Sequence, residues 1–294
     1  MRQFALVVVL ALFLPVPATG QRNIAHRAAL ARDASVRIHN MVGSVRVTGW
    51  DHDSLVVTGT VRESKGEPFG FFASTTGAKL GIWDASTPDV GPSHIDVRVP
   101  ASSVVWIKTA SADVIVSGMT GSIDIYAVSG RIEVSGAPGE VNAESLSGEV
   151  RIAADARSVR AKTATGPLAL RGNIAEASAT TVSGDIAIEG AVLERGRFET
   201  VDGDIRYVGA IGGKSSLDFV THAGAVEFLV PRDAAADFVV STYEGGFEDR
   251  LGVNARVSGS SLKGREIRFT LGAGNIAGQV SVRSFKGRVV LGTK

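Results

Sequence analysis

The chain has 294 residues, of which 44% are apolar and 21% are charged, and its formal net charge is +1. This composition is too apolar for a disordered chain, and the balanced charge gives no basis for a nucleic-acid or anionic-membrane partner. The absence of cysteine excludes disulfides and thiol chemistry. The chain has 35 glycines and only 6% aromatic residues, which favours tight turns over most helical folds.

The first twenty residues have the pattern of a secretory signal peptide. Arg2 precedes an uncharged run from Phe4 to Leu14, and the small residues Ala18 and Gly20 occupy the expected cleavage region. The run is shorter than the ~20 residues of a membrane-spanning helix, and no comparable run follows it. We expect cleavage after Gly20, with a cut after Ala18 as the second choice. The mature chain is then soluble, has no membrane span, and is periplasmic or extracellular at the cell surface.

Residues 21–33 are expected to form a linker, and residues 34–100 a strand-rich N-terminal cap. Alternation of apolar and polar residues predicts strands at about 35–39, 44–48, 54–62 and 94–99.

A loop-rich insertion at residues 65–92 interrupts this cap and carries four aromatic side chains. These rings either plug the open end of the fold or form an exposed patch, because large apolar surfaces on soluble proteins are buried or used for binding. They are the candidate partner-binding residues: Phe69, Phe71, Phe72 and Trp83.

A nine-residue repeat over residues 121–184 is the strongest pattern in the chain. Eight positions spaced nine apart are each followed by apolar residues at plus two and plus four; six of the eight are glycine, and the exceptions are Arg157 and Ala175. From residue 139 onward the apolar pairs alternate between small and bulky. A coil of about eighteen residues with two unequal faces accounts for both observations. We therefore predict an all-β fold, with residues 101–294 forming a parallel β-solenoid.

Side chains outside the apolar positions agree with an eighteen-residue register. Ser145, Thr163 and Thr181 fall in one column, and Glu133 falls beside Arg151, as Arg131 does beside Glu149. Beyond residue 184 the spacing loosens to 19 and then 21, so the coils there have 18 to 21 residues. A β-sandwich is the alternative, although a nine-residue register held over seven steps is hard to explain in one.

A second irregular insertion is expected at residues 232–264, with a short helical turn around Asp233 to Asp237. It contains an acidic cluster, Glu244, Glu248 and Asp249 with Arg250. Parallel β-helices also carry polysaccharide lyases and hydrolases, which use paired acids. A charged loop without a catalytic role is the simpler interpretation of this cluster.

The sequence predicts no catalytic, cofactor-binding or metal-binding residues. The five histidines, at positions 26, 39, 52, 94 and 222, lack the spacing of a metal site. The segment Asp51-His52-Asp53 could hold a weak ion, but three polar residues between two strands are typical of a solvated turn.

The chain resembles the bacterial putative-adhesin family of unknown function, which is built from repeated β-strands. The resemblance rests on Ile95 to Pro100 leading into Val104 to Gly118, on the repeated Ser/Thr-Gly-x-Ile-x-Ile units, and on the closing segment Gly274 to Leu291. It covers roughly residues 34–294. It implies an exported or envelope-associated protein that binds rather than catalyses, and it supplies no catalytic residues.

The leading hypothesis is therefore an exported, non-enzymatic binding or scaffolding module of the cell envelope, whose partner is an envelope glycan or a surface protein. Two alternatives stay open: a polysaccharide-acting enzyme on a β-helix, and a self-assembling structural protein. The sequence does not fix the oligomeric state.

Overall fold

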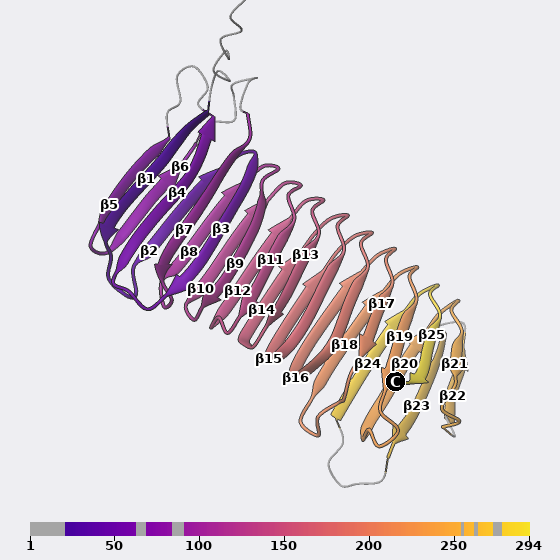
Figure 1. Ribbon diagram of the computed structural model, residues 1–294. Coiled ribbons are helices and arrows are strands. Elements are labelled where there is room, and N and C mark those ends of the chain that lie inside the picture. The colour runs from indigo at the N-terminus through magenta and orange to yellow at the C-terminus, as the bar shows by residue number, and fades with distance from the viewer. Residues whose placement is uncertain (1–20, 63–68, 84–90, 254–255, 262–263, 273–277) are drawn as a thin grey trace, which may run out of the picture.

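The computed structural model describes residues 21–62, 69–83, 91–253, 256–261, 264–272 and 278–294, and within them the protein is all-β, as predicted. These residues form 25 strands and contain no helix. Most strand pairs are parallel, and the strands are arranged as one long stack (Figure 1). The expected signal peptide lies outside the described residues. No helix in the described ranges has the length and apolar character needed to cross a membrane.

The N-terminal part of the stack has nine strands: β1 (Gln21–Ala29), β2 (Ser35–Asn40), β3 (Gly43–Trp50), β4 (Ser54–Arg62), β5 (Gly70–Ser74), β6 (Gly77–Gly81), β7 (Ser93–Pro100), β8 (Val104–Thr109) and β9 (Asp113–Met119). The central part has eight: β10 (Ser122–Ala127), β11 (Ile132–Gly136), β12 (Glu140–Ser145), β13 (Val150–Ala154), β14 (Ala156–Lys162), β15 (Leu168–Thr180), β16 (Ile186–Thr200) and β17 (Ile205–Val208). The last eight are β18 (Ser216–Thr221), β19 (Val226–Val230), β20 (Ala236–Thr242), β21 (Phe247–Asp249), β22 (Arg256–Ser261), β23 (Gly264–Leu271), β24 (Gly278–Ser284) and β25 (Val289–Thr293).

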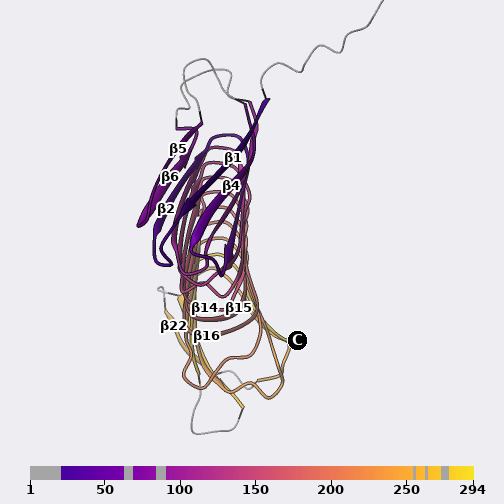
Figure 2. The same cartoon turned by 60° about the vertical axis from the view of Figure 1, so that its left-hand side comes forward.

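The strands form two faces, and the chain alternates between them through the centre of the stack. Face 1 runs in the order β1, β4, β7, β3, β9, β11, β13, β15, β16, β17, β19, β25, β21. Face 2 runs β5, β6, β2, β8, β10, β12, β14, β15, β16, β18, β24, β20, β23, β22. The long strands β15 and β16 belong to both faces. Successive strands of each face lie behind one another when the stack is turned (Figure 2).

The predicted eighteen-residue register is confirmed in the centre of the stack. Ile123 pairs with Val141 and then Val159 on face 2, while Ile132 pairs with Val150 and then Leu168 on face 1. Alternate side chains of each strand point inward, so the apolar residues of both faces form one core. We call one strand of each face, with its two corners, a coil.

Hydroxyl groups satisfy the backbone at one corner of several coils. The Ser145 hydroxyl accepts a hydrogen bond from the amide of Gly148 at 2.9 Å, and Thr181 does the same for Gly184 at 3.0 Å. Thr163 and Thr181 contact each other at 3.2 Å, which confirms the predicted hydroxyl column. Glu133 pairs with Arg151, as predicted. Arg131 and Glu149 directly precede the paired residues Ile132 and Val150, as the register predicts, while the ion pairs of Arg131 are with Asp113 and Glu133.

The coils become longer where the core becomes aromatic. Ile186 pairs with Ile205, nineteen residues later, and Phe198 pairs with Phe219, twenty-one residues later. Phe198, Phe219 and Tyr207 are fully buried, and the Tyr207 hydroxyl donates to the carbonyl of Ala210 at 2.7 Å. Burial raises the pKa of Tyr207 to about 12. Because a close-packed interior must enclose these larger rings, the chain needs extra residues per coil.

Both ends of the stack are threaded out of chain order. The coil formed by β2 and β3 lies between the later strands β6–β7 on one side and β8–β9 on the other. At the other end, the last coil, β24 and β25, lies between β18–β19 and β20–β21. Antiparallel strands β1, β4 and β5 cover the first end, and β22 and β23 extend the other.

Three local expectations are wrong. Residues 21–29 of the expected linker form β1, because their backbone pairs with the otherwise open edge of β4. Within the 65–92 insertion, a hairpin of β5 and β6 continues face 2. The helical turn expected around Asp233 is a non-helical turn at Arg232 and Asp233, and β20, which begins at Ala236, pairs with β23 on one side and β24 on the other.

Candidate functional site

A row of aromatic rings lies on the outer side of face 2 near the N-terminal end. It runs from Phe72 on β5, through Trp83 after β6 and His39 on β2, to Trp106 on β8 and Tyr126 on β10. Ring-centre distances are 6.3 Å for Phe72–Trp83, 5.5 Å for Trp83–His39, 5.1 Å for His39–Trp106 and 5.8 Å for Trp106–Tyr126. We call these five residues the aromatic row.

Strand register positions the row. The apolar neighbours of Trp106, Val105 and Ile107, point into the core, so the indole faces outward. Trp106 lies opposite Arg37 of β2 and Asp124 of β10, and Lys108 lies opposite Tyr126. The spacing between the rings therefore follows the distance between neighbouring strands, about 4.8 Å.

Three cations accompany the row: Arg37, Lys79 and Lys108. Lys79 lies over the ring of Trp83, with its Nζ 4.4 Å from the ring centre. Burial lowers the pKa of His39 below its ordinary value of 6.5, and the charges of Lys79, Lys108 and Arg37 lower it further. His39 is therefore neutral at pH 7, and the three cations lie close enough to act on it together.

A shallow hollow of about 560 Å³ lies against this row. One carboxylate lines it, that of Asp124, which accepts a hydrogen bond from Asn142 at 3.3 Å. The residues lining the hollow are Ser35, Arg37, His39, Lys79, Val104, Trp106 and Asp124.

The structure separates the four aromatic residues singled out from the sequence. Phe69 is buried and Phe71 packs against the core; both stack on His26, at 5.7 and 4.5 Å. Phe72 is 67% exposed and Trp83 is half-buried, and both belong to the aromatic row. Two of the four thus help to close the end of the stack, and two face solvent.

Sequence reasoning missed His39, Trp106 and Tyr126. A usable signal was present, because each occupies an outward position in a strand whose inward residues are apolar. The juxtaposition itself could not be found this way, since it depends on β6 and β8 both flanking β2.

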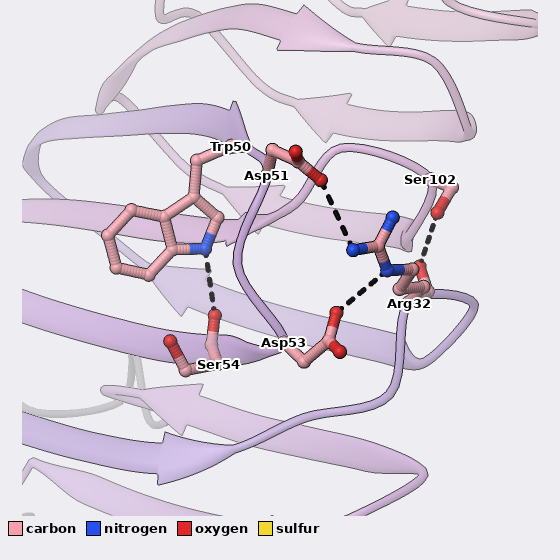
Figure 3. Close-up of polar contacts among 6 residues, drawn as sticks. All are labelled: Arg32, Trp50, Asp51, Asp53, Ser54 and Ser102. Carbon is pink, nitrogen blue, oxygen red and sulfur yellow. Dashed lines mark hydrogen bonds and ion pairs between the residues drawn. The ribbon is translucent and has the colours of Figure 1, made fainter.

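The Asp51-His52-Asp53 segment is part of a set of polar contacts between neighbouring turns, which we call the clasp (Figure 3). Arg32, in the turn before β2, contacts Asp53 at 2.8 Å and Asp51 at 3.3 Å, so one guanidinium offsets part of the negative charge of the two carboxylates. The Ser102 hydroxyl donates to the carbonyl of Arg32 at 2.7 Å, and the Trp50 indole donates to the carbonyl of Ser54 at 2.9 Å. The clasp joins the turns before β2, before β4 and before β8.

The acidic cluster around Glu248 is engaged in local contacts. Glu248 contacts Arg250 at 2.8 Å and Arg288 at 3.3 Å, and the hydrogen bond from Arg250 is the main cause that lowers its pKa. Asp249 accepts hydrogen bonds from the amides of Leu251 and Gly252 at 2.9 Å each. Glu248 is thus held ionised, whereas the general acid of a glycosidase needs a raised pKa. Among the described residues, no group of three or more metal-ligating side chains occurs.

A second exposed feature is an apolar ridge along the corner that precedes the turn glycines. Val128, Leu146, Val182 and Val201 are 43–59% exposed, and the half-buried Ala164 lies between Leu146 and Val182. Backbone hydrogen bonds join the corners in sequence, for example Val182 to Ala164 at 3.0 Å and Val201 to Val182 at 3.1 Å. The line continues through three stacked rings, His222, Phe285 and Tyr243. We call these eight residues the apolar ridge.

Comparison with known proteins supports the fold. No family model and no curated protein matches this chain. Its structure aligns with a putative lipid binding protein from Parabacteroides distasonis at a TM-score of 0.57, 11% identity and coverage of 94% of this chain and 98% of that chain. A putative adhesin from Parabacteroides merdae aligns at 0.57, with 10% identity and coverage of 93% and 97%.

A putative adhesin from Parabacteroides distasonis aligns at a TM-score of 0.50, with 11% identity and coverage of 92% of this chain and 97% of that chain. All three alignments span nearly the whole of both chains, although about nine residues in ten differ. Over nearly its whole length, the chain therefore has the fold of bacterial proteins described as adhesins, as the resemblance in its sequence predicts.

Proposed function

We propose that this protein is an exported, non-enzymatic β-solenoid that serves as a binding module of the cell envelope, with the aromatic row as its binding surface. The parallel register of 18 to 21 residues per coil on two faces supports the solenoid architecture. A rigid stack of this kind holds the row in a fixed geometry, which reduces the ordering cost of binding.

The aromatic row carries the proposal because it differs from the rest of face 2. Farther along that face, outward charges pair with neighbours on adjacent strands, for example Lys162 with Glu144 and Arg283 with Asp218. At the N-terminal end the outward positions hold rings and cations instead. Half-exposed tryptophan and tyrosine side chains are enriched at binding surfaces, since they offer large contact areas at low entropic cost.

The pattern of the first twenty residues supports export and a place in the periplasm or at the cell surface. The names of the similar structures also support a binding role: two are described as adhesins and one as a lipid-binding protein. The lowered pKa of Glu248 does not suit the role of a general acid, although it leaves the role of an ionised carboxylate open.

Binding to envelope material tests this proposal. Purified residues 21–294 are expected to be retained by an isolated envelope fraction, and Trp106→Ala is expected to weaken retention about tenfold, as hot-spot aromatic residues do. Lys214→Ala, which truncates an exposed side chain farther along the stack and outside both the aromatic row and the apolar ridge, is the control. Equal retention of all three proteins, with unchanged stability, would refute the row as the binding surface.

The apolar ridge favours a second candidate function, self-association. A line of mostly apolar side chains that are at least partly exposed, as on this ridge, is typical of an interface between proteins. The apparent mass of the protein is expected to rise with concentration in sedimentation experiments. Replacing Leu146 and Val182 by lysine should abolish that rise, whereas lysine at the neighbouring exposed Ser147 and Ser183 should not. A wild-type chain that stays monomeric over the whole range would exclude this candidate.

A further inference from the structure

We infer that the aromatic row binds an acidic glycan, whose sugar rings contact the aromatic side chains while its carboxylates meet Arg37, Lys79 and Lys108. This inference rests on the binding function proposed above and names the chemical class of the ligand. It follows from the charges around the row, the surfaces of the rings and the shape of the hollow.

Three cations beside the row lack anionic partners in the described part of the chain. Within the described residues, the side chains of Arg37, Lys79 and Lys108 form no ion pair, and Lys79 instead lies over Trp83. Their joint effect on His39 shows that their positive fields overlap at the centre of the row. Since Asp124 is the one carboxylate lining the hollow, the site carries a net positive charge.

The neighbouring carboxylates on face 2 do not cancel this charge. Glu140 and Glu144, on the neighbouring strand β12, are each paired with a cation of β14, Arg157 and Lys162 respectively. The Asp124 carboxylate accepts from Asn142, which also donates to the hydroxyl of Tyr126 at 3.1 Å. The positive field therefore persists at the row while the acids beside it are already engaged.

The aromatic rings also limit which kind of anion fits the site. Aromatic side chains offer apolar surface at the centre of the site, and a small inorganic anion would leave it uncovered. A sugar acid combines C–H faces that can cover rings with a carboxylate that cations can bind. The hollow lies within the range of about 300–1,000 Å³ typical of small-molecule sites, and its open, shallow form suits part of a polymer.

The backbone holds these groups in place before any ligand arrives. Trp83 follows Ile82, whose amide donates to the carbonyl of His39 at 3.0 Å, and this bond sets the indole against the imidazole. Gly81, directly opposite His39, has φ of +122°, and a Cβ there would lie 1.9 Å from the His39 carbonyl oxygen. Only glycine permits this approach of β6 to β2, so the ring pair is built into the strand pairing.

Binding to polygalacturonate, a polymer of uronic acid, tests the inference against the same polymer after its carboxylates are reduced to alcohols. The protein is expected to bind polygalacturonate at least ten times more tightly than the reduced polymer, and salt should weaken the interaction. Lys79→Glu should reduce affinity at least tenfold. Lys214→Glu makes the same change in net charge at an exposed site before β18, and should leave affinity within twofold of wild type.

The results of these binding experiments distinguish failure of the acidic-glycan assignment from failure of the binding function. Equal affinity for both polymers, or equal effects of the two lysine variants, overturns the acidic specificity but leaves a binding module in place. Retention on the envelope fraction without binding to polygalacturonate, or a preference for single-stranded DNA over polygalacturonate, likewise overturns the glycan assignment alone. Loss of retention on every envelope fraction overturns both.

Discussion

Gly166→Ala is expected to destabilise the fold by about 3 kcal/mol or more, the upper part of the range for overpacking. A Cβ at position 166 would lie 2.1 Å from the carbonyl oxygen of Gly148 in the preceding coil. The oxygen belongs to backbone that is fixed in the stacked corner, so it cannot move aside as a flexible side chain would. Denaturant unfolding of the variant measures the loss directly.

Gly246→Ala is the matched control for this prediction. A Cβ at position 246 has nothing within 4 Å, and its backbone is outside the left-handed region, so the change should alter stability by less than about 0.5 kcal/mol. The same contact recurs along the column: a Cβ at Gly184 would lie 2.0 Å from the Gly166 oxygen, and one at Gly203 2.0 Å from the Gly184 oxygen. Equal unfolding midpoints for the 166 and 246 variants would show that the corners can relax.

The room available for a Cβ also explains why two of the eight positions in the nine-residue repeat are not glycine. At Gly139 a Cβ would lie 3.4 Å from the carbonyl oxygen of Thr120, an ordinary contact. The next two corners on that side hold Arg157 and Ala175, which are the two exceptions in the repeat. The repeat of nine thus alternates between a corner that requires glycine and a corner that, from Gly139 onward, tolerates side chains; at the first position of the second series, Gly121, a Cβ would still lie 2.1 Å from the carbonyl oxygen of Ser103. The sequence shows the alternation of the faces but not this difference between corners.

The alternation of apolar and polar residues predicted which side chains face the core and how the central coils pair. The alternation around Ile123 and Ile132 determines which side chains enter the core, and the eighteen-residue register follows from it. The order of strands at the ends depends on non-local pairing instead. Nothing near β2 in sequence indicates that β6 will pair with one of its edges and β8 with the other.

The candidate site was only partly predictable for the same reason. Phe72 and Trp83 stood out as aromatic residues in an insertion, yet their neighbours His39 and Trp106 come from strands on either side of that insertion in the sequence. Their contact follows from the threading of the end coil. A search of outward strand positions for aromatic residues would have found the members of the row, but not their order.

Removal of residues 278–294 is expected to abolish folding, because the last coil lies inside the stack. β24 pairs with β18 on one side and β20 on the other, and β25 lies between β19 and β21, so its loss separates two parts of the core. The buried apolar residues lost are Val280, Val282, Val289, Val290 and Leu291. At about 1.5–3 kcal/mol each, their burial contributes on the order of 10 kcal/mol, comparable to the whole stability of a domain. Circular dichroism and limited proteolysis measure the outcome.

A point variant measures the contribution of the last coil to stability in a chain that still folds. Leu291→Ala removes a fully buried side chain from β25 and should cost about 2–5 kcal/mol, while Thr293→Ala, at an exposed position of the same strand, should be nearly neutral. If the chain without residues 278–294 folds, with β20 paired directly with β18, the prediction for the truncation is wrong. That outcome would mean that the end coils can move along the stack, and that the inserted position of β24 and β25 is not required for folding.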